Sequence, residues 1–325
     1  MPDPVLALDL GGTKIRAALV HGIGAGESSA DDSTEEPPRL ERIAETATPA
    51  TAGPAAILGA ALELAEQVRS GTAVRAVGLS SAGVIDSARG RVTHATDSLT
   101  GWAGTDLLTP FRERFGVGVS ALNDVHAHGL GEARFGAGRH HGSLLLVAVG
   151  TGIGGCHVLG GSVVAGGRGA AGHIGHVPVP EAAGIPCPCG RTGHLEGLAS
   201  GPGIVRLAHR LGAGTALRDG RALAAAAQAG ESGAREAYRI AGAVTGRVLG
   251  ALLNVLDPEI VTVTGGVAEA PGPWREALAD GIRQEAMDVV ADTPVLSATA
   301  GSHAALLGAA ARCLDDLAAP VAARP

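Results

Sequence analysis

The chain has few cysteines, and it lacks the sequence signals of secretion, membrane insertion and nucleic-acid binding. Four cysteines among 325 residues suit a reducing compartment better than a disulfide-rich secreted domain. The N-terminus has no basic segment or cleavage site, and no apolar run reaches membrane-spanning length. A net charge of -7 without a basic stripe argues against nucleic acid as a partner. The sequence therefore predicts a soluble cytoplasmic protein without a membrane or nucleic-acid partner.

Lysine is almost absent as well. Lys14 is the only lysine, and every other basic side chain is an arginine. It follows a pair of glycines, where a compact ammonium group suits a phosphate. Chance composition explains a single lysine equally well, so both interpretations stay open.

The chain is long enough for two domains, and its apolar runs alternate between strand and helix patterns. This alternation indicates an α/β protein with a domain boundary near residue 121. The expected strands cover residues 5–10, 15–20, 74–79, 117–122, 144–149, 156–159 and 260–264. The expected helices cover residues 55–69, 123–134, 234–256 and 304–317. A long exposed loop is expected over residues 21–40, which are rich in Gly, Ser, Glu and Pro.

Two strand–turn–strand units open the two halves of the chain, which indicates a degenerate duplication. Gly11 and Gly12 form the first turn after a strand that carries Asp9, and residues 150–155 (GTGIGG) form the second. A dinucleotide-binding motif is excluded because a strand follows the glycines where a helix is required, and a Walker A loop is absent. A lone glycine hairpin is usually only a turn, but two matching ones favour phosphate binding by bare backbone N–H groups.

A cluster of metal-ligand residues is the most informative feature of the second half. Cys187, Cys189 and His194 lie within eight residues, and His176 precedes them by eleven. Two cysteines and two histidines can close a tetrahedral zinc site, whereas a disulfide between Cys187 and Cys189 would be strained. The alternative is a pair of buried cysteines and surface histidines that never meet a metal. Glu196, a carboxylate that zinc does not need, suggests a platform for a polar ligand.

Taken together, these motifs resemble the ROK family of sugar kinases. The resemblance rests on Asp9-Leu-Gly-Gly-Thr-Lys14, Asn123-Asp124, the GTGIGG segment, Gly172-His-Ile-Gly-His176, the Cys/His cluster and Thr264-Gly-Gly266. It covers essentially the whole chain in the right order. It implies the actin-like ATPase (ribonuclease H-like) fold, with two α/β domains around a central cleft and a structural zinc loop. Residues 1–121 and the C-terminal helix 302–318 would form one domain, and residues 122–301 the other.

The resemblance also implies roles for individual residues. The groups expected to hold ATP and magnesium (Mg2+) are Asp9, Gly11, Gly12, Thr13, Lys14, Thr151, Gly152, Gly154, Gly155, Gly265 and Gly266. The groups expected on the sugar are Ser81, Gly83, Asn123, Asp124, His173, His176 and Glu196. Asp124 would be the catalytic base, and at the start of a helix we expect it to ionise readily because the helix dipole favours its negative form. The zinc ligands would be His176, Cys187, Cys189 and His194.

Three positions depart from the family pattern. His194 replaces the third cysteine of the zinc loop, His173 replaces a glutamate, and Ala82 replaces a proline before Gly83. Histidine is an accepted zinc ligand, so we expect zinc to bind. An imidazole N–H at position 173 can donate to an acetamido carbonyl, which a carboxylate cannot do. The turn is also similar to that of bacterial N-acetylmannosamine kinases.

The predicted function is therefore an ATP-dependent kinase for the 6-hydroxyl of a hexose or N-acetylhexosamine. N-acetylmannosamine is the favoured substrate and glucose the alternative, since His173 could merely pack against the zinc loop. A non-catalytic sugar-sensing protein or a sugar-responsive repressor is a rival class. The chain starts four residues before its first strand, so we expect no winged helix, and the intact Asp124 favours the kinase. The resemblance favours a homodimer or homotetramer.

Overall fold

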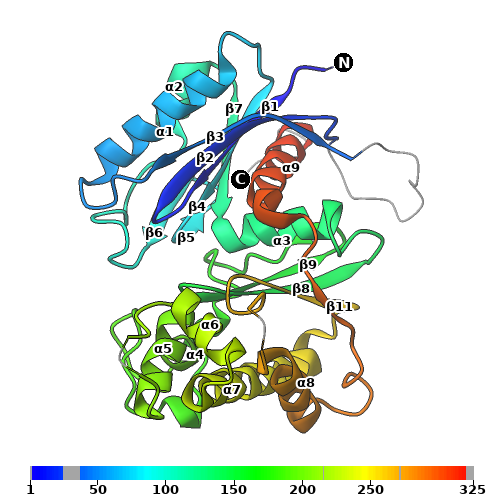
Figure 1. Ribbon diagram of the computed structural model, residues 1–325. Helices are drawn as coiled ribbons and strands as arrows, with labels where there is room; N and C mark the ends of the chain where they lie inside the picture. Colours follow the sequence, from blue (N-terminus) through cyan, green and yellow to red (C-terminus); the bar gives the residue numbers. More distant parts are fainter. Residues whose placement is uncertain (1, 25–36, 215, 271, 320–325) are drawn as a thin grey trace. The chain divides into compact units, whose positions relative to one another are not determined.

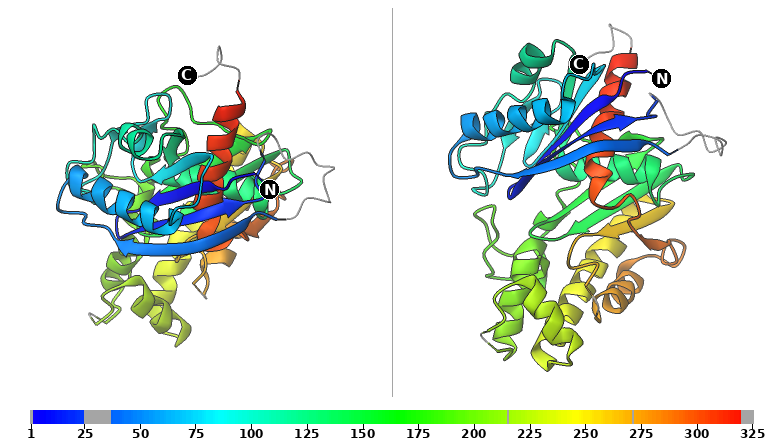
Figure 2. Two further views of the ribbon diagram at one scale, coloured as in Figure 1. Left: turned by 90° about the horizontal axis from the view of Figure 1, so that it is seen from above. Right: turned by 45° about the horizontal axis from the view of Figure 1, so that its top comes forward.

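The structure is a computed structural model that describes residues 2–24, 37–214, 216–270 and 272–319, in two compact units (Figures 1 and 2). Unit 1 consists of Met1–Leu144, Cys156–Ala171 and Ala298–Pro325, and unit 2 of Leu145–Gly155 and Gly172–Ser297. This division differs from the predicted boundary near residue 121. The difference arises because α3 (Asp124–Phe135) packs against α9 (Ala304–Ala318) within unit 1.

Among the described residues, unit 1 combines a five-stranded sheet, a small hairpin, four α-helices and one short 3-10 helix. Its strands are β1 (Val5–Leu10), β2 (Lys14–His21), β3 (Arg39–Ala47), β4 (Ala76–Ser81), β5 (Val84–Asp86), β6 (Arg91–His94), β7 (Gly118–Asn123) and β10 (Ser162–Val163). Its other helices are α1 (Pro54–Arg69), α2 (Thr109–Phe115) and the short 3-10 helix η3 (Gly301–His303). The sheet has the order β3-β2-β1-β4-β7, in which β1, β4 and β7 are parallel and β2 and β3 run antiparallel to their neighbours.

Both faces of β1 are covered, which explains why its sequence is apolar except for Asp9. Leu6 and Leu8 pack in one buried cluster with Ile57 of α1, and Val5 and Ala7 pack in another with residues of α9. Side chains alternate between the two faces of a strand. Asp9 therefore lies on the face of the sheet that α9 covers, at the end where the chain turns.

The two helices that cover this face approach each other through glycines (Figure 1). A Cβ atom at Gly308 of α9 would lie 1.8 Å from the carbonyl oxygen of Ala127 in α3. A Cβ at Gly131 of α3 would lie 2.1 Å from the carbonyl oxygen of Ala304. Neither position has room for a larger residue, so these glycines fix how closely α3 and α9 pack.

Unit 2 is mainly helical. It also contributes strands to a second sheet. The second sheet has the order β10-β9-β8-β11-β12, and the border between the units runs through β8 (Ser143–Val149) and β9 (Ile153–Leu159). Unit 2 also contains β11 (Ile260–Thr264), β12 (Val295–Ser297), η1 (Ile174–His176), η2 (Pro180–Ala182), α4 (Leu195–Ala199), α5 (Gly201–Arg210), α6 (Gly220–Gln228), α7 (Ser232–Leu256) and α8 (Trp274–Glu285). By length and composition alone α7 could cross a membrane, but α5, α6 and α8 pack against it and half of its most apolar stretch is buried. It is a core helix of unit 2.

Most strands and long helices lie where the sequence predicts them. The hairpin of β1 and β2, the strand β11 and the helices α1, α3, α7 and α9 are confirmed to within about two residues. The predicted turn over residues 150–155 is too long: β9 already begins at Ile153, so Gly154 and Gly155 lie in a strand. The strand β3 and the hairpin of β5 and β6 were not predicted. Residues 25–36 of the expected loop 21–40 lie outside the described residues.

Candidate functional site

The first glycine turn connects β1 to β2 and leaves its tip exposed. The backbone N–H of Gly11 donates to the carbonyl oxygen of Lys14 at 3.1 Å, which closes the turn. Thr48, just after β3, donates its hydroxyl to the carbonyl oxygen of Gly11 at 2.7 Å. Gly12 and Thr13 at the tip are exposed. The turn is thus held from behind, and its outer backbone can meet a ligand.

Asp9, at the end of β1, has both carboxylate oxygens engaged. Oδ1 accepts a hydrogen bond from the hydroxyl of Ser80 at 2.7 Å, and Oδ2 pairs with Nη2 of Arg16 at 2.8 Å. Sequence reasoning missed Arg16 and Ser80. The signal was the strand pairing, because both residues lie directly opposite Asp9, on β2 and on β4. Arg16 orients the carboxylate and offsets its charge.

Lys14 points to a different partner from the one predicted. Its ammonium group lies 2.9 Å from the carboxylate of Glu45 on β3, and both side chains are about half exposed (51% and 59%). An exposed pair of this kind is weak and easily exchanged for another anion. The expected position of Lys14 near ATP phosphates therefore stays a prediction.

Asn123 and Asp124 form the junction of β7 and α3. The side-chain oxygen of Asn123 caps the helix by accepting from the backbone N–H groups of Val125 and His126. Its amide nitrogen donates to the carbonyl oxygen of Gly83 at 2.9 Å and to Oδ1 of Asp124 at 2.8 Å. These four bonds fill the hydrogen-bonding capacity of the amide. Asn123 thus holds Asp124 and Gly83 in place, and its expected direct contact with the sugar stays a prediction.

The ionisation of Asp124 differs from the expectation. Burial, followed by the negative charge of Asp9, raises the pKa of Asp124 to about 6. Hydrogen bonds from Val125 and Asn123 lower it, but they do not compensate. The expectation of a readily ionised carboxylate is therefore wrong in direction, since desolvation outweighs the helix terminus. The carboxylate is a stronger base than an exposed aspartate.

Ser81 and Gly83 support this junction from behind. The buried hydroxyl of Ser81 donates to the carbonyl oxygen of Ala82 at 3.0 Å and accepts from the indole N–H of Trp102 at 3.2 Å. Gly83 has a φ of 99°, and a Cβ there would lie 2.7 Å from the carbonyl oxygen of His94. Only glycine fits at this position. In this conformation the carbonyl oxygen of Gly83 accepts the hydrogen bond from Asn123. Sugar contacts of Ser81 and Gly83 stay predictions.

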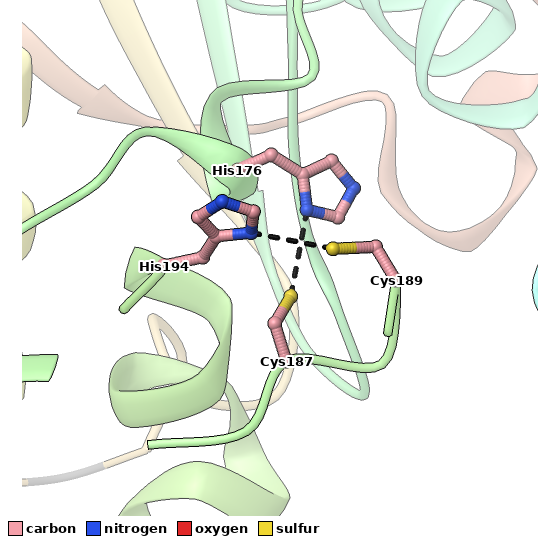
Figure 3. A group of neighbouring side chains, drawn as sticks. All are labelled: His176, Cys187, Cys189 and His194. Atoms are coloured by element: carbon pink, nitrogen blue, oxygen red, sulfur yellow. Dashed lines mark hydrogen bonds between the residues drawn. The ribbon is translucent and has the colours of Figure 1, made fainter. Parts of the chain in front are cut away.

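Unit 2 brings together the predicted zinc ligands. Figure 3 shows the side chains of His176, Cys187, Cys189 and His194 pointing at one another, and their ligand atoms all lie within 4.8 Å of one another. Sγ of Cys187 lies 3.5 Å from Nδ1 of His176, and Sγ of Cys189 lies 3.3 Å from Nδ1 of His194. We call these four residues the metal group. In Figure 3 the line that joins His176 to Cys187 crosses the line that joins His194 to Cys189.

The donor set and spacing of the metal group fit zinc. Tetrahedral zinc with bonds of about 2.3 Å to sulfur and about 2.1 Å to nitrogen separates neighbouring S and N donors by about 3.6 Å. Burial and the neighbouring Cys189 raise the pKa of Cys187 to about 11, so a thiolate there needs a cation beside it. Four protein ligands leave no open position, which is typical of a structural site. Both histidines turn Nδ1 toward a cysteine sulfur of the group, so Nε2 of His176 is not part of it.

His173 lies beside the metal group without belonging to it. Its ring stacks on that of His176 with centroids 6.0 Å apart and an angle of 22° between the ring planes. It is partly exposed, directly before η1. The geometry keeps both predicted alternatives open, because a stacked imidazole can still present a ring nitrogen to a ligand.

The second glycine turn, residues 150–152, and the pair Gly265 and Gly266 also meet in unit 2. The turn closes by a 2.9 Å bond from the N–H of Gly150 to the carbonyl oxygen of Gly152. Gly265 follows β11 and has a φ of 94°. A Cβ atom at this position would lie only 2.5 Å from the carbonyl oxygen of Val149. The predicted phosphate turn and adenosine contact are therefore neighbours. Glu196 of α4 reaches the same turn, since its Oε2 accepts from the N–H of Ile153 at 2.7 Å.

The chain is similar to known proteins over nearly its whole length. The model of the ROK family matches residues 5–315. A glucokinase of Streptomyces coelicolor is 30% identical, covering 94% of this chain and 96% of that one. A kanosamine kinase of Amycolatopsis mediterranei is 35% identical (94% of each chain), and an N-acetylmannosamine kinase of Salmonella arizonae 30% identical (96% and 98%).

Solved structures share the fold. A ROK family glucokinase from Streptomyces griseus, in complex with glucose and AMPPNP, superposes with a TM-score of 0.76 at 29% identity over 94% of this chain and 98% of that one. A ROK family transcriptional regulator, a homologue of the E. coli MLC protein, gives 0.79 at 22% identity over 96% and 78%, which concerns the fold alone. The predicted actin-like ATPase fold is confirmed.

Proposed function

Because the chain belongs to the ROK family, we propose that it is an ATP-dependent kinase that phosphorylates the 6-hydroxyl of a hexose or N-acetylhexosamine. The observation that carries this proposal is the junction of β7 and α3. There Asp124 is held by Asn123 at the start of a helix and its carboxylate is made more basic by burial and by Asp9. A protein that only binds sugar needs no such base.

Phosphoryl transfer requires mainly alignment and charge neutralisation. Asn123 and the backbone N–H of Val125 both bind Oδ1 of Asp124. This arrangement leaves Oδ2 to accept the proton of the sugar hydroxyl as the phosphoryl group arrives. With a pKa of about 6, Asp124 is ionised at neutral pH and still basic enough to take that proton.

The nucleotide would be held mainly by backbone. The exposed tip of the first turn, Gly12 and Thr13, and the turn of Thr151 and Gly152 offer N–H groups to phosphate oxygens. Gly265 and Gly266 offer a flat surface to adenosine. Magnesium, when bound, neutralises phosphate charge near Asp9. The AMPPNP bound to the Streptomyces griseus relative supports ATP as the phosphoryl donor.

N-acetylmannosamine is the proposed substrate, with glucose as the alternative. His173 supports this choice because its ring can donate to an acetamido carbonyl, and the relative from Salmonella arizonae is an N-acetylmannosamine kinase. Relatives named as glucokinase and kanosamine kinase are equally similar or more so. The sugar panel that tests the proposal must therefore contain all three sugars.

Zinc is proposed as a structural ion of the metal group. We expect elemental analysis of purified protein to find one zinc per chain. Cys189→Ser removes the exposed ligand and should lower both the zinc content and the melting temperature. A protein free of metal that keeps its melting temperature after chelation would contradict the zinc proposal.

The decisive experiment follows ATP consumption over N-acetylmannosamine, glucose, kanosamine and N-acetylglucosamine. The proposal predicts sugar-dependent ADP release with N-acetylmannosamine preferred. Sugar binding without ATP consumption would favour the class of non-catalytic sugar-sensing proteins. A cytoplasmic location, which the composition of the sequence predicts, and a dimeric or tetrameric assembly, which the resemblance implies, complete the proposal.

A further inference from the structure

Glu196 connects the metal group to the second glycine turn of unit 2. It is the second residue of α4, which begins directly after the metal ligand His194. Its side chain is buried, with 8% of the residue exposed. Oε2 accepts a hydrogen bond from the backbone N–H of Ile153 at 2.7 Å. Ile153 is the first residue of β9 and directly follows Gly152.

The turn is shaped around this carboxylate. A Cβ atom at Gly152 would lie 2.7 Å from Oε2 of Glu196, so a larger residue would push the carboxylate away. The opposite end of the turn is held by the N–H of Gly201, the first residue of α5, which donates to the carbonyl oxygen of Gly150 at 2.8 Å. Two short segments after the metal group therefore hold both ends of the turn.

The metal group in turn fixes the start of α4. His194 is the residue before the helix, and the N–H of Leu195 donates to the carbonyl oxygen of Val177 at 3.0 Å, next to the ligand His176. One histidine of the metal group directly precedes the first residue of α4, and the other directly precedes the residue that accepts the hydrogen bond from it. A metal that binds both histidines sets the position of Glu196, one residue beyond Leu195.

Resting on the proposed kinase function, we propose that Glu196 is a positioning residue for the nucleotide. Oε2 holds the turn Gly150–Gly152 in the shape that binds phosphate, and the metal group keeps Glu196 in place. In the described part of the chain Oε1 carries no hydrogen bond, which leaves it for the sugar hydroxyl that the family resemblance assigns to Glu196. One carboxylate would then serve both substrates.

The first test measures the affinity of the protein for magnesium AMPPNP without sugar, in Glu196→Ala and Glu196→Gln. Because Glu196→Ala removes a charged hydrogen-bond partner, the affinity for magnesium AMPPNP should fall about tenfold in this variant. Glu196→Gln keeps a carbonyl oxygen that can accept from Ile153, so it should retain most of the affinity. A role confined to the sugar predicts no change in either variant. Gly220→Ala, which adds a methyl group to open space at the start of α6, is the control.

The second test reads the contact directly, through hydrogen exchange of the Ile153 amide in nucleotide-free protein. Exchange should be at least about tenfold faster in Glu196→Ala than in wild type, and faster in wild type after zinc chelation. This readout needs no activity. A wild type that neither binds AMPPNP nor phosphorylates a sugar would refute the kinase function, while exchange would still test the contact. Wild-type exchange and wild-type AMPPNP affinity in a folded, zinc-loaded Glu196→Ala protein would overturn the inference.

Discussion

Asp124 experiences opposing influences that the sequence reveals only in part. Its position at the first residue of α3 and its hydrogen bonds from Val125 and Asn123 favour the charged form. Burial and the nearby charge of Asp9 favour the neutral form and win, giving a pKa of about 6. A sequence pattern can place an aspartate at a helix start. The desolvation it suffers depends on elements that come from elsewhere in the chain.

This pKa makes a prediction about the pH dependence of catalysis. Asp124 must be ionised to act as a base, so kcat/KM should fall tenfold per pH unit below about pH 6 and level off above it. Initial rates at low sugar concentration, from about pH 5 to 8, measure this limb for the free enzyme. A profile that stays flat down to about pH 5 would contradict the raised pKa.

A second prediction at the residue scale concerns the choice of sugar. His173→Glu should lower kcat/KM for N-acetylmannosamine by a factor of about ten or more, because the carboxylate cannot donate to the acetamido carbonyl. The value for glucose should hold or rise. The comparison uses specificity constants for N-acetylmannosamine, N-acetylglucosamine and glucose in both proteins. A wild type that prefers glucose, or an unchanged ranking of the sugars in the variant, would contradict the assignment to N-acetylmannosamine. The broader proposal of a ROK family hexose kinase would remain.

At the scale of elements, the sequence predicts what is buried and misses what is half exposed. The strands β1 and β11 are buried along their whole length and carry no more than two polar residues each, and each was predicted. The strand β3 was missed because it lies at the sheet edge and most of its residues are partly or fully exposed. Its apolar pattern is correspondingly weak.

The candidate site shows the same limit. The residues of the metal group are close in sequence, so their convergence could be predicted from spacing. The pair of Asp9 and Arg16 depends on strand register, and the contact of Glu196 with Ile153 joins positions 43 residues apart. Neither is visible in a local pattern, because each arises only when separate elements pack.

The glycine contacts of α3 and α9 give a prediction about packing. Gly308→Ala should destabilise the protein by about 3 kcal/mol, because a Cβ 1.8 Å from the Ala127 carbonyl oxygen forces the helices apart. Gly59→Ala is the matched control: it lies in α1 with open space around it and should stabilise by about 0.5–1 kcal/mol. Urea denaturation midpoints measure both changes. A Gly308→Ala protein as stable as wild type would show that the crossing is looser than the structure indicates.

Over the whole molecule, the proposed machinery is divided between the two units. Unit 1 carries the first glycine turn, Asp9 and Asp124, and unit 2 carries the second glycine turn, the adenosine pair and the metal group. Each unit therefore carries only part of the set of residues proposed for the reaction. The chain passes from one unit to the other at residues 144–145, 155–156, 171–172 and 297–298.

The central claim is that this protein transfers phosphate from ATP to a sugar with Asp124 as the base. Asp124→Asn, measured for turnover and for sugar binding in parallel, tests it most directly. The amide keeps the shape but cannot take a proton, so we expect kcat to fall by about a thousandfold while sugar affinity stays within a few fold of wild type. The melting temperature above pH 7 should hold or rise, because the substitution removes a charge that desolvation and the charge of Asp9 both disfavour. A folded Asp124→Asn protein that turns over at a near wild-type rate would contradict the account.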